Sequence, residues 1–559
     1  MAQMRAGVAV IEALRAEGVE YIFGISGSTT NNIVTELHGR TDIRFLDTRH
    51  EQAAALMAYG YSRASGKPSV CLTTSGPATI NLSTGIALAY KGRAPVMVIA
   101  GDVKRDHLDR DGAQAFDLVN LFKPITYLAK HVHKTERILE GVHDAFRAAM
   151  SGKRGPVMLN IPRDLLDNQT IDEPPRKPES YRPTTQRTRG DEDAVKRAVA
   201  LLAQAKRPLL LAGGGVIDSE ATDQAVELAE LAGMALIPGY GHNDAVPNSH
   251  PLYIGMPGWR GAVEATEAIY HADVILALGS RLSQHSTEWN HHIINESTKI
   301  IQVDIDSAEV GRNFAIEVGI AGDAKAVAMQ LIECLRGKQR PNTEWRSEIA
   351  ALRERRKTRL HAELELSGDP MLPQRVYPEL AKVLPRDCMV TIDAGICPGF
   401  AYDRLNFDLP RTLINYSGQG GLGMGLCVSL GTKLGRPDRP ALGLQGDGGF
   451  MYLSGELNTA VRWKIPQVSI VLNNGCHGSE KFQQQRQWGG RFVGVDLDNP
   501  RFDKLAEVYG AKGYYVQRPQ DIADTVKAAF AVDGPAVIEI PVAQYFPPRP
   551  PTPGGGKGH

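Results

Sequence analysis

The sequence predicts an α/β protein made of three domains, each built around a doubly wound parallel sheet. One observation behind this prediction is the length of 559 residues, which suits three or four domains with cores of their own. Another is that short apolar runs alternate with helix-length segments along the chain. Strands that alternate with such helices form βαβ crossovers within a parallel sheet. We expect the three domains over residues 1–172, 190–340 and 370–545.

The N-terminal domain shows this alternation most clearly. Its expected strands are short apolar runs, and its expected helices carry apolar residues on one face. The strands are expected over residues 18–24, 69–73, 95–100 and 156–161, and the helices over residues 51–64 and 78–90. Residues 173–190 contain four prolines, many charges and no periodicity, so we interpret them as a linker.

The rest of the chain repeats the alternation. In the central domain, strands are expected over residues 208–212, 274–278 and 300–303. A charged helical segment follows over residues 344–365, and such a run more often forms a solvated face than a binding site. Residues 546–559 are rich in proline and glycine, so we expect a flexible tail or a lid there.

Composition argues against several classes of function. The 63 Lys and Arg residues balance the 63 Asp and Glu residues, whereas a general binder of nucleic acid or anionic membranes would show a basic excess. No apolar run approaches the ~18–20 residues of a transmembrane helix, and no secretory signal is visible. The six cysteines include no CxxC pair. We therefore expect a cytoplasmic protein without nucleic-acid or membrane partners.

The most informative stretch covers residues 440–474. A strand-like run ends in Gly446-Asp447-Gly448-Gly449, a helix is expected over 454–463, and a second strand over 467–472 ends in Asn473-Asn474. A carboxylate and an amide therefore follow two strands, at the sheet edge where doubly wound proteins bind ligands. Glycines there let backbone N–H groups approach an anion, and Asp447 and Asn474 offer oxygen ligands that suit Mg²⁺. Without the second strand, Gly-Asp-Gly would indicate an ordinary turn.

This spacing of Gly-Asp-Gly and Asn-Asn resembles the signature of the thiamine-diphosphate-dependent enzymes. Two other segments fit the same resemblance, namely Arg49–Ala54 at a helix start and Thr73–Asn81. Together they resemble the acetolactate synthase branch over essentially the whole chain. The resemblance implies a pyrimidine-binding domain, a central domain and a diphosphate-binding domain, in that order. It also implies a homodimer or homotetramer with sites at the subunit interfaces.

The resemblance assigns roles to residues on the pyrimidine side. Glu51 is expected to bind the aminopyrimidine ring and to favour the imino tautomer, whose nitrogen removes the reactive proton of the cofactor. Pro77 and Asn81 match positions that line the pyrimidine. Gln114 matches a catalytic position at the substrate entry, although the neighbouring Ala113 stands where acetolactate synthases carry Phe.

On the diphosphate side, Leu422 matches the apolar residue that bends the cofactor. The expected cofactor-binding residues of this domain are Gly420, Leu422, Gly446, Asp447, Gly448, Gly449 and Asn474. The Mg²⁺ ligands implied by the resemblance are Asp447, Asn474 and the backbone oxygen of Cys476. His477 is the titratable residue placed to face the reacting carbonyl, with either a proton-transfer role or a place in the pocket wall.

The central domain has a weaker signal for a second cofactor. Gly213-Gly214-Gly215, Gly279-Ser280-Arg281 and residues 302–306 loosely match the places where acetolactate synthases hold FAD and relatives hold ADP. Glycines after a strand are also ordinary turns. FAD or ADP is therefore one expectation for this domain, and no second cofactor is the other.

The function implied by the resemblance is decarboxylation of a 2-keto acid and transfer of the resulting enamine to an acceptor. The run Gly478-Ser479-Glu480-Lys481 is more similar to sulfoacetaldehyde acetyltransferases, which keeps an acetyltransferase open. A 2-hydroxyacyl lyase or a 2-keto acid decarboxylase is a further alternative. From a different class, Gly418, Gly420 and Gly423 spell GxGxxG and admit a nucleotide-binding oxidoreductase. Intact Glu51 and Asp447 disfavour a catalytically silent paralogue.

Overall fold

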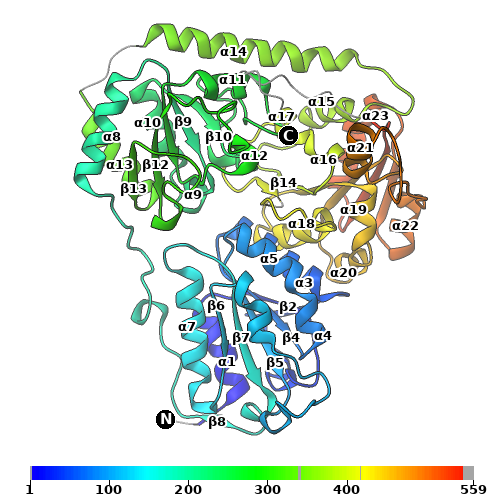
Figure 1. Cartoon of the computed structure of the whole chain (residues 1–559). Helices are drawn as coiled ribbons and strands as arrows, with labels where there is room; N and C mark the ends of the chain where they lie inside the picture. The colour runs from blue at the N-terminus through cyan, green and yellow to red at the C-terminus, as the bar shows by residue number, and fades with distance from the viewer. Residues whose placement is uncertain (1–2, 338–341, 416, 546–559) are drawn as a thin grey trace.

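The computed structural model describes residues 3–337, 342–415 and 417–545, and the expected tail lies outside them. Three parallel sheets form the centres of three domains (Figure 1), which confirms the predicted fold class. Their strand orders are β3-β2-β4-β5-β7-β6, β10-β9-β11-β12-β13 and β15-β14-β16-β17-β19-β18. A small antiparallel pair, β1 (Met4–Arg5) with β8 (Thr170–Ile171), ties the two ends of the N-terminal domain together.

The N-terminal sheet has helices on both faces. Its six strands are β2 (Tyr21–Ile25), β3 (Arg44–Asp47), β4 (Ser69–Thr73), β5 (Val96–Asp102), β6 (Leu128–His131) and β7 (Val157–Pro162). Its helices are α1 (Ala6–Ala16), α2 (Asn31–Val34), α3 (Glu51–Ser65), α4 (Pro77–Asn81), α5 (Ser83–Lys91), α6 (Leu118–Phe122) and α7 (Ile138–Met150). The helix expected over residues 78–90 is divided at Leu82 into α4 and α5. Over residues 173–190 the chain is mostly irregular, with one short 3₁₀ turn at Pro178–Ser180.

The central sheet matches the expected strands closely. Its strands are β9 (Pro208–Ala212), β10 (Ala235–Pro238), β11 (Val274–Leu278), β12 (Lys299–Asp304) and β13 (Val318–Ala321). The helices around it are α8 (Glu192–Gln204), α9 (Gly214–Asp218), α10 (Thr222–Ala232), α11 (Val263–His271), α12 (Gln284–Thr287) and α13 (Ala324–Leu335). All residues of β9 and β11 are buried, as expected for parallel strands covered on both faces.

The C-terminal sheet carries most of the candidate site. Its strands are β14 (Met389–Ile392), β15 (Leu413–Asn415), β16 (Ala441–Gly446), β17 (Val468–Asn473), β18 (Lys512–Tyr515) and β19 (Ala536–Pro541). Its helices are α15 (Val376–Ala381), α16 (Ile396–Gly399), α17 (Ala401–Arg404), α18 (Met424–Gly435), α19 (Asp447–Tyr452), α20 (Glu456–Arg462), α21 (Gly478–Gln487), α22 (Phe502–Tyr509) and α23 (Pro519–Phe530). The sequence predicted α20 but not α19, which begins at Asp447 itself.

Helices α3 and α18 join the N-terminal and C-terminal domains. A Cβ atom on Gly60 would lie 2.1 Å from the carbonyl oxygen of Val428, and one on Gly431 would lie 1.9 Å from that of Met57. Both glycines are therefore required for the close approach of the two backbones. The contact fixes α3, which begins at Glu51, against the domain that carries Asp447.

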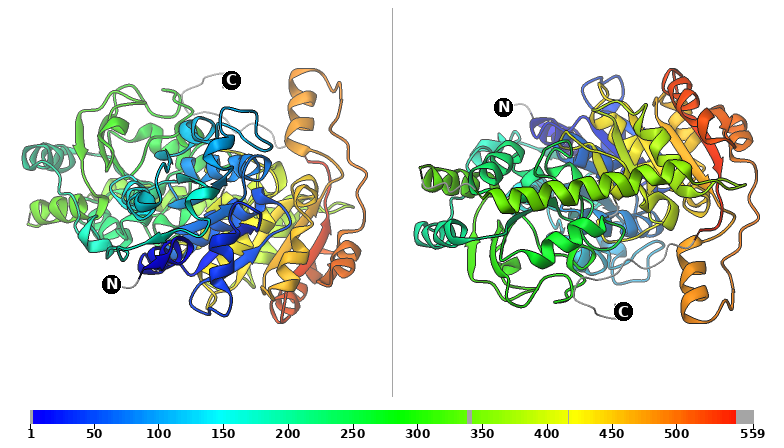
Figure 2. Two further views of the ribbon diagram at one scale, coloured as in Figure 1. Left: turned by 90° about the horizontal axis from the view of Figure 1, so that it is seen from below. Right: turned by 90° about the horizontal axis from the view of Figure 1, so that it is seen from above.

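Helix α14 (Thr343–Ala362) runs along the central domain and reaches the C-terminal domain (Figure 2). Arg356 pairs with Asp403 at 2.9 Å, and Arg359 pairs with both Asp403 and Glu264 at 2.9 Å. The expectation of a solvated charged face was wrong for this side of the helix, because Asp403 and Glu264 are buried. The charges of α14 hold two domains together. None of the described helices is both long and apolar enough to cross a bilayer.

Candidate active site

Asp447 and Asn474 lie at the carboxyl ends of two neighbouring strands. Strand β16 ends at Gly446, β17 ends at Asn473, and Gly446 pairs with Leu472 in the parallel ladder. Each residue follows its strand by one position, so both lie at the same edge of the sheet. Both side chains are buried. The structure thus brings together the carboxylate and the amide that the sequence predicted.

The Asp447 carboxylate is held by the amide of Asn499, to which the sequence analysis assigned no role at this site. Asn499 Nδ2 donates to Asp447 Oδ2 at 2.7 Å and to Asn473 Oδ1 at 3.1 Å. Burial raises the pKa of the Asp447 carboxyl, although hydrogen bonds from Gly448 and Asn499 oppose this effect. Within residues 3–337, 342–415 and 417–545, no Lys, Arg or His forms an ion pair with Asp447. A buried carboxylate without a cationic partner fits a bound cation.

Asn474 and Cys476 continue this cluster. Asn474 Oδ1 accepts the Cys476 N–H at 3.3 Å, and its Nδ2 donates to Cys397 Sγ at 3.6 Å. Gln544 Nε2 donates to the Asn474 carbonyl at 3.2 Å. Burial raises the pKa of the Cys476 thiol to about 11. Mg²⁺ takes oxygen ligands, so the backbone oxygen of Cys476 suits this cation better than the sulfur.

The described part of the chain has no group of three His, Cys, Asp or Glu side chains that could hold a metal ion. A cation at Asp447 would therefore need the Asn474 amide, a backbone oxygen and ligands from outside the protein. This donor set fits Mg²⁺, which is usually held by one or two carboxylates together with water and phosphate oxygens.

The glycines of the candidate site differ in the space that lies beside their backbones. Nothing lies within 4 Å of a Cβ placed on Gly446 or Gly420, so space is open beside both backbones. A Cβ on Gly448 would lie 2.7 Å from His477 Cε1, and one on Gly449 would lie 2.8 Å from Asp393 Oδ2. Gly446 and Gly420 fit a cofactor phosphate group, whereas Gly448 and Gly449 make room for protein side chains. A cofactor-binding role was expected for all four of these glycines, and it stays a prediction.

Asp393 is a buried residue that the sequence did not indicate. It follows β14, and its carboxylate accepts the N–H groups of Ala394 at 2.7 Å and Gly425 at 3.1 Å. Burial raises the pKa of this carboxyl to about 7, although backbone donors at the start of α18 lower it. Asp393 thereby connects Gly449 with the loop that carries the half-buried Leu422.

Glu51 and Pro77 begin helices α3 and α4 of the N-terminal domain, and Asn81 ends α4. Glu51 is the first residue of α3, and Asn81 Nδ2 donates to its Oε2 at 3.0 Å. His50 precedes it, and its ring accepts the Gln52 N–H at 3.1 Å, which caps the helix. Pro77 begins α4 and is exposed, as is Asn81.

Gln114 lies beside the same group. Ser75 Oγ donates to its Oε1 at 3.3 Å, and its backbone packs against Gly76. The residue is exposed, and its backbone φ is 65°, a value that residues other than glycine rarely adopt. Among the residues that the structure describes, no hydrogen bond or ion pair joins the Glu51 group to the Asp447 group.

The central-domain glycines that were considered for a second cofactor lie close against other protein segments. A Cβ on Gly213 would lie 2.2 Å from the Gly279 oxygen, and one on Gly214 would lie 2.9 Å from the His242 ring. Asp304, at the end of β12, pairs with Arg93 at 3.4 Å. Packing between protein segments explains these glycines, so the arrangement gives no support for FAD or ADP.

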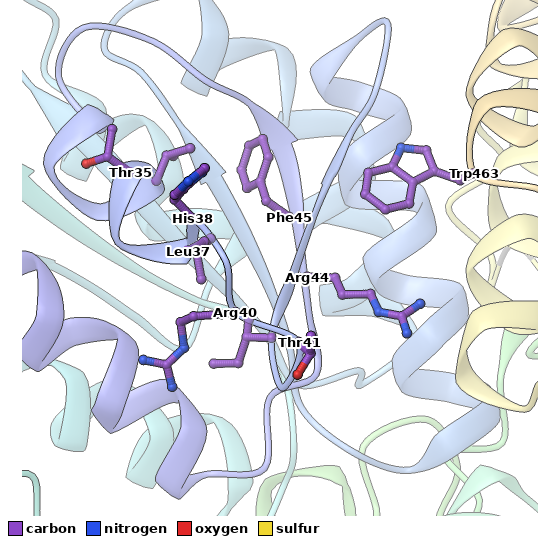
Figure 3. A pocket seen from close by; sticks show the side chains of 10 residues that line it. Thr35, Leu37, His38, Arg40, Thr41, Arg44, Phe45 and Trp463 are labelled. Carbon is purple, nitrogen blue, oxygen red and sulfur yellow. The ribbon is translucent and has the colours of Figure 1, made fainter.

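A cavity of about 900 Å³ lies beside the edge strand β3, away from the residues described above (Figure 3). Trp463 reaches it from the C-terminal domain, and the other lining residues come from the N-terminal domain. The lining residues are Val34, Thr35, Leu37, His38, Arg40, Thr41, Ile43, Arg44, Phe45 and Trp463. None of the predicted site residues is among them.

Comparison with known families assigns all three domains. The chain matches the thiamine pyrophosphate enzyme models for the N-terminal TPP binding domain over residues 4–121, the central domain over 195–331 and the C-terminal TPP binding domain over 393–540. The three domains therefore define an enzyme that uses thiamine diphosphate.

Similar proteins narrow this class. A probable acetolactate synthase large subunit of Methanocaldococcus jannaschii is 34% identical over 563 residues, which cover 98% of this chain and 94% of the relative. An acetolactate synthase of Mycobacterium avium is 34% identical over 559 residues, 98% of this chain and 89% of the relative. A sulfoacetaldehyde acetyltransferase of Alcaligenes xylosoxydans xylosoxydans is 34% identical over 552 residues, 94% of this chain and 90% of the relative. The chain belongs to the acetolactate synthase branch of the thiamine pyrophosphate enzyme family.

Proposed function

We propose that this enzyme decarboxylates a 2-keto acid and transfers the remaining acyl unit to an acceptor carbonyl, with thiamine diphosphate and Mg²⁺ as cofactors. The observation that carries the proposal is the buried Asp447 carboxylate, which has no cationic partner among the described residues and lies beside Asn474 and the open backbone of Gly446. Bound thiamine diphosphate would supply a nucleophilic carbon together with a cationic ring that can accept the electron pair released on decarboxylation. Asp447, Asn474 and the Cys476 carbonyl would hold the metal and the diphosphate.

Glu51 is the proposed proton-handling residue. Its carboxyl would hold or give a proton at the ring nitrogen of the aminopyrimidine, with Asn81 orienting Oε2 through their 3.0 Å hydrogen bond. Glu51 is the first residue of α3. Pro77 and Gln114 would line the same side of the site, and His477 would face the substrate from the side of Gly448.

The proposed active unit is a homodimer, alone or within a homotetramer. Pro77, Asn81 and Gln114 are exposed on the single chain, although a cofactor ring in water would be poorly protected. Met451 and Tyr452, in the helix that begins at Asp447, expose 42% and 58% of their surface. Exposed apolar side chains next to half of a site favour a contact with a second copy of the chain. Glu51 of one subunit would then face the Asp447 site of its partner.

The nearest alternative is transfer from the same donor to an acceptor of another kind, as the similarity to a sulfoacetaldehyde acetyltransferase suggests. A lyase acting on a 2-hydroxyacyl substrate, or a simple 2-keto acid decarboxylase, uses the same residues. The family assignment disfavours the oxidoreductase reading of Gly418, Gly420 and Gly423. Cytoplasmic location stays a prediction. FAD or ADP in the central domain also stays a prediction, and no step is assigned to it.

The test is CO₂ release from a panel of 2-keto acids, with and without acceptor aldehydes or phosphate. We expect Glu51→Gln to lower turnover by about a hundredfold or more while thiamine diphosphate still binds. Glu192→Gln, at the exposed start of α8, is the matched control and should behave as wild type. Full activity of Glu51→Gln, or no CO₂ from any 2-keto acid, would overturn the proposal.

A further inference from the structure

A tight loop of the central domain, residues 255–261, reaches the C-terminal domain beside the candidate site. Arg260 Nη1 donates to the Gly395 carbonyl, and its Nη2 lies 3.4 Å from Ser479 Oγ. Gly395 and Ser479 follow strands β14 and β17 at the edge of the sheet that also carries Asp447. Arg260 has a φ of 62°, and a Cβ on Gly399 would lie 2.1 Å from its Nη1. The guanidinium therefore lies directly against the backbone of α16.

The charge of Arg260 is not neutralised by a carboxylate. It is half-buried, and in the described part of the chain it forms no ion pair. Its partners are a carbonyl, a hydroxyl and the ring of Trp259, whose centroid lies 4.1 Å from the guanidinium carbon. Arg93 and Arg356, in contrast, reach between domains and are paired with Asp304 and Asp403. A half-buried cation without a counter-ion favours an anion from solution.

Arg260 also lies close to the residues that would hold the cofactor. Its positive charge acts on the Cys397 thiol, although burial dominates and raises the pKa of that thiol. Cys397 Sγ in turn contacts Asn474 Nδ2 at 3.6 Å. Ser479 is separated from His477 by one residue. A small molecule that reacts beside His477 can therefore reach Arg260 with a second group.

We propose that Arg260 binds an oxyanion, a carboxylate or a sulfonate, carried by the acceptor substrate, with Ser479 Oγ as a second donor. This inference rests on the proposed function. A guanidinium offers five N–H donors in a planar fork that matches such oxyanions. Trp259, which is 48% exposed, would keep the plane of the guanidinium in place by stacking.

The charge that each substrate keeps during the reaction indicates whether Arg260 binds the donor or the acceptor. The carboxylate of a 2-keto acid leaves as neutral CO₂, so a cation bound to it would stabilise the reactant more than the transition state and slow the step. An oxyanion elsewhere on the acceptor keeps its charge while the new carbon–carbon bond forms. Binding that group orients the acceptor carbonyl without opposing decarboxylation.

The first experiment compares Arg260→Gln and Arg260→Lys with wild type in CO₂ release and in ligation. The acceptors are an aldehyde that carries a sulfonate or a carboxylate and the neutral aldehyde of the same chain length. Arg260→Gln should raise KM for the anionic acceptor about tenfold or more, and Arg260→Lys should raise it less. KM for the neutral acceptor and CO₂ release without an acceptor should stay within about twofold. Arg518→Gln, an exposed arginine at the start of α23, is the matched control.

Calorimetric titration of the holoenzyme with methanesulfonate, and with neutral dimethyl sulfone, gives a readout other than activity. Methanesulfonate should bind wild type and Arg518→Gln, and its affinity should fall about tenfold or more in Arg260→Gln. Equal binding to Arg260→Gln, or equal losses with both aldehydes, would overturn the proposal. If wild type releases no CO₂ from any 2-keto acid, the proposed function fails, and the titration alone decides whether Arg260 binds an oxyanion.

Discussion

The Glu456 carboxylate accepts the backbone N–H of His50 at 3.0 Å, across 406 positions of the sequence. The same oxygen accepts the N–H of Arg49 at 3.0 Å, and Thr459 Oγ1 donates to the other oxygen at 2.6 Å. Glu456 begins α20, which follows α19 and Asp447, whereas His50 directly precedes Glu51. One buried carboxylate therefore connects the diphosphate side of one domain with the start of the helix that carries the proton-handling residue.

Replacing Glu456 with Gln should disturb Glu51 without touching any substrate. The amide oxygen can still accept both N–H groups, but it lacks the negative charge, and the NH₂ group in place of Oε2 cannot accept the Thr459 hydroxyl. Leaving these buried donors less well matched costs about 1–3 kcal/mol. We expect kcat to fall about tenfold while thiamine diphosphate affinity changes little, and hydrogen exchange at the start of α3 should increase. Glu507→Gln on the exposed side of α22 is the control. Unchanged exchange at Arg49 and His50 would contradict this role.

Removal of the metal should weaken thiamine diphosphate binding as much as the substitution Asp447→Asn does. Asp447→Asn should weaken thiamine diphosphate binding about a hundredfold, because the metal loses its charged ligand and Asn499 remains hydrogen-bonded to the amide. Binding is measured by titration with excess Mg²⁺ and with a chelator. Chelated wild type and Asp447→Asn should bind equally weakly, and Asp438→Asn at an exposed turn should bind as wild type. A chelator without effect would exclude the metal site.

The free energy of unfolding should depend on pH because of the Asp393 carboxyl. Burial raises the pKa of this carboxyl to about 7 from its ordinary value of 3.8, so the folded protein keeps a proton that the unfolded chain loses. Between these two values, rising pH therefore lowers the free energy of unfolding, and above about pH 7 the contribution is constant. Asp393→Asn lacks this titration.

The measurement is the thermal unfolding midpoint at about pH 5, pH 6 and pH 7. The wild-type midpoint should fall relative to that of Asp393→Asn as the pH rises through this range. Asp438→Asn, at an exposed turn, should show no such divergence. A wild-type midpoint that rises relative to that of Asp393→Asn would show that the folded protein holds this carboxyl ionised.

Two neighbouring glycines should respond differently to alanine. Gly446 has a φ of −81° and open space beside it, so Gly446→Ala should leave the cofactor-free protein stable but weaken thiamine diphosphate binding. Gly448→Ala places a methyl group 2.7 Å from His477 Cε1 and should destabilise the cofactor-free protein by about 1–3 kcal/mol. Thermal unfolding and cofactor titration separate the two effects. Equal stability of both variants without cofactor would contradict this division.

Much of the fold could be predicted because its signals are local. The strands at 69–73, 208–212 and 274–278 were predicted to the residue, since buried parallel strands are continuous apolar runs with clear ends. The break between α4 and α5 was missed because both segments have helical composition. The buried side of α14 was missed because Asp403 and Glu264, its ionic partners, lie far away in the sequence.

The residues of the candidate site also fall into two groups, those marked by a local sequence pattern and those that are not. The places of Asp447, Asn474 and Glu51 in the fold could be predicted because each lies in a short motif at the end of a strand or the start of a helix, whereas their roles in catalysis and binding stay predictions. Asp393, Glu456, Asn499 and Arg260 could not, since their partners lie far away along the chain and no spacing marks them. A carboxyl residue directly after the apolar run Met389–Ile392, as Asp393 is, was the one local signal that could have drawn attention.

The close approach of α3 and α18, at Gly60 against Val428 and at Gly431 against Met57, has a consequence for the evolution of the sequence. Each backbone occupies the volume that a side chain on the opposite glycine would need, so neither position can change first without separating α3 from α18. Selection should therefore act against substitution of either glycine. Homologues that keep this junction should carry glycine at both positions, and a lineage that has lost one should also have lost the other.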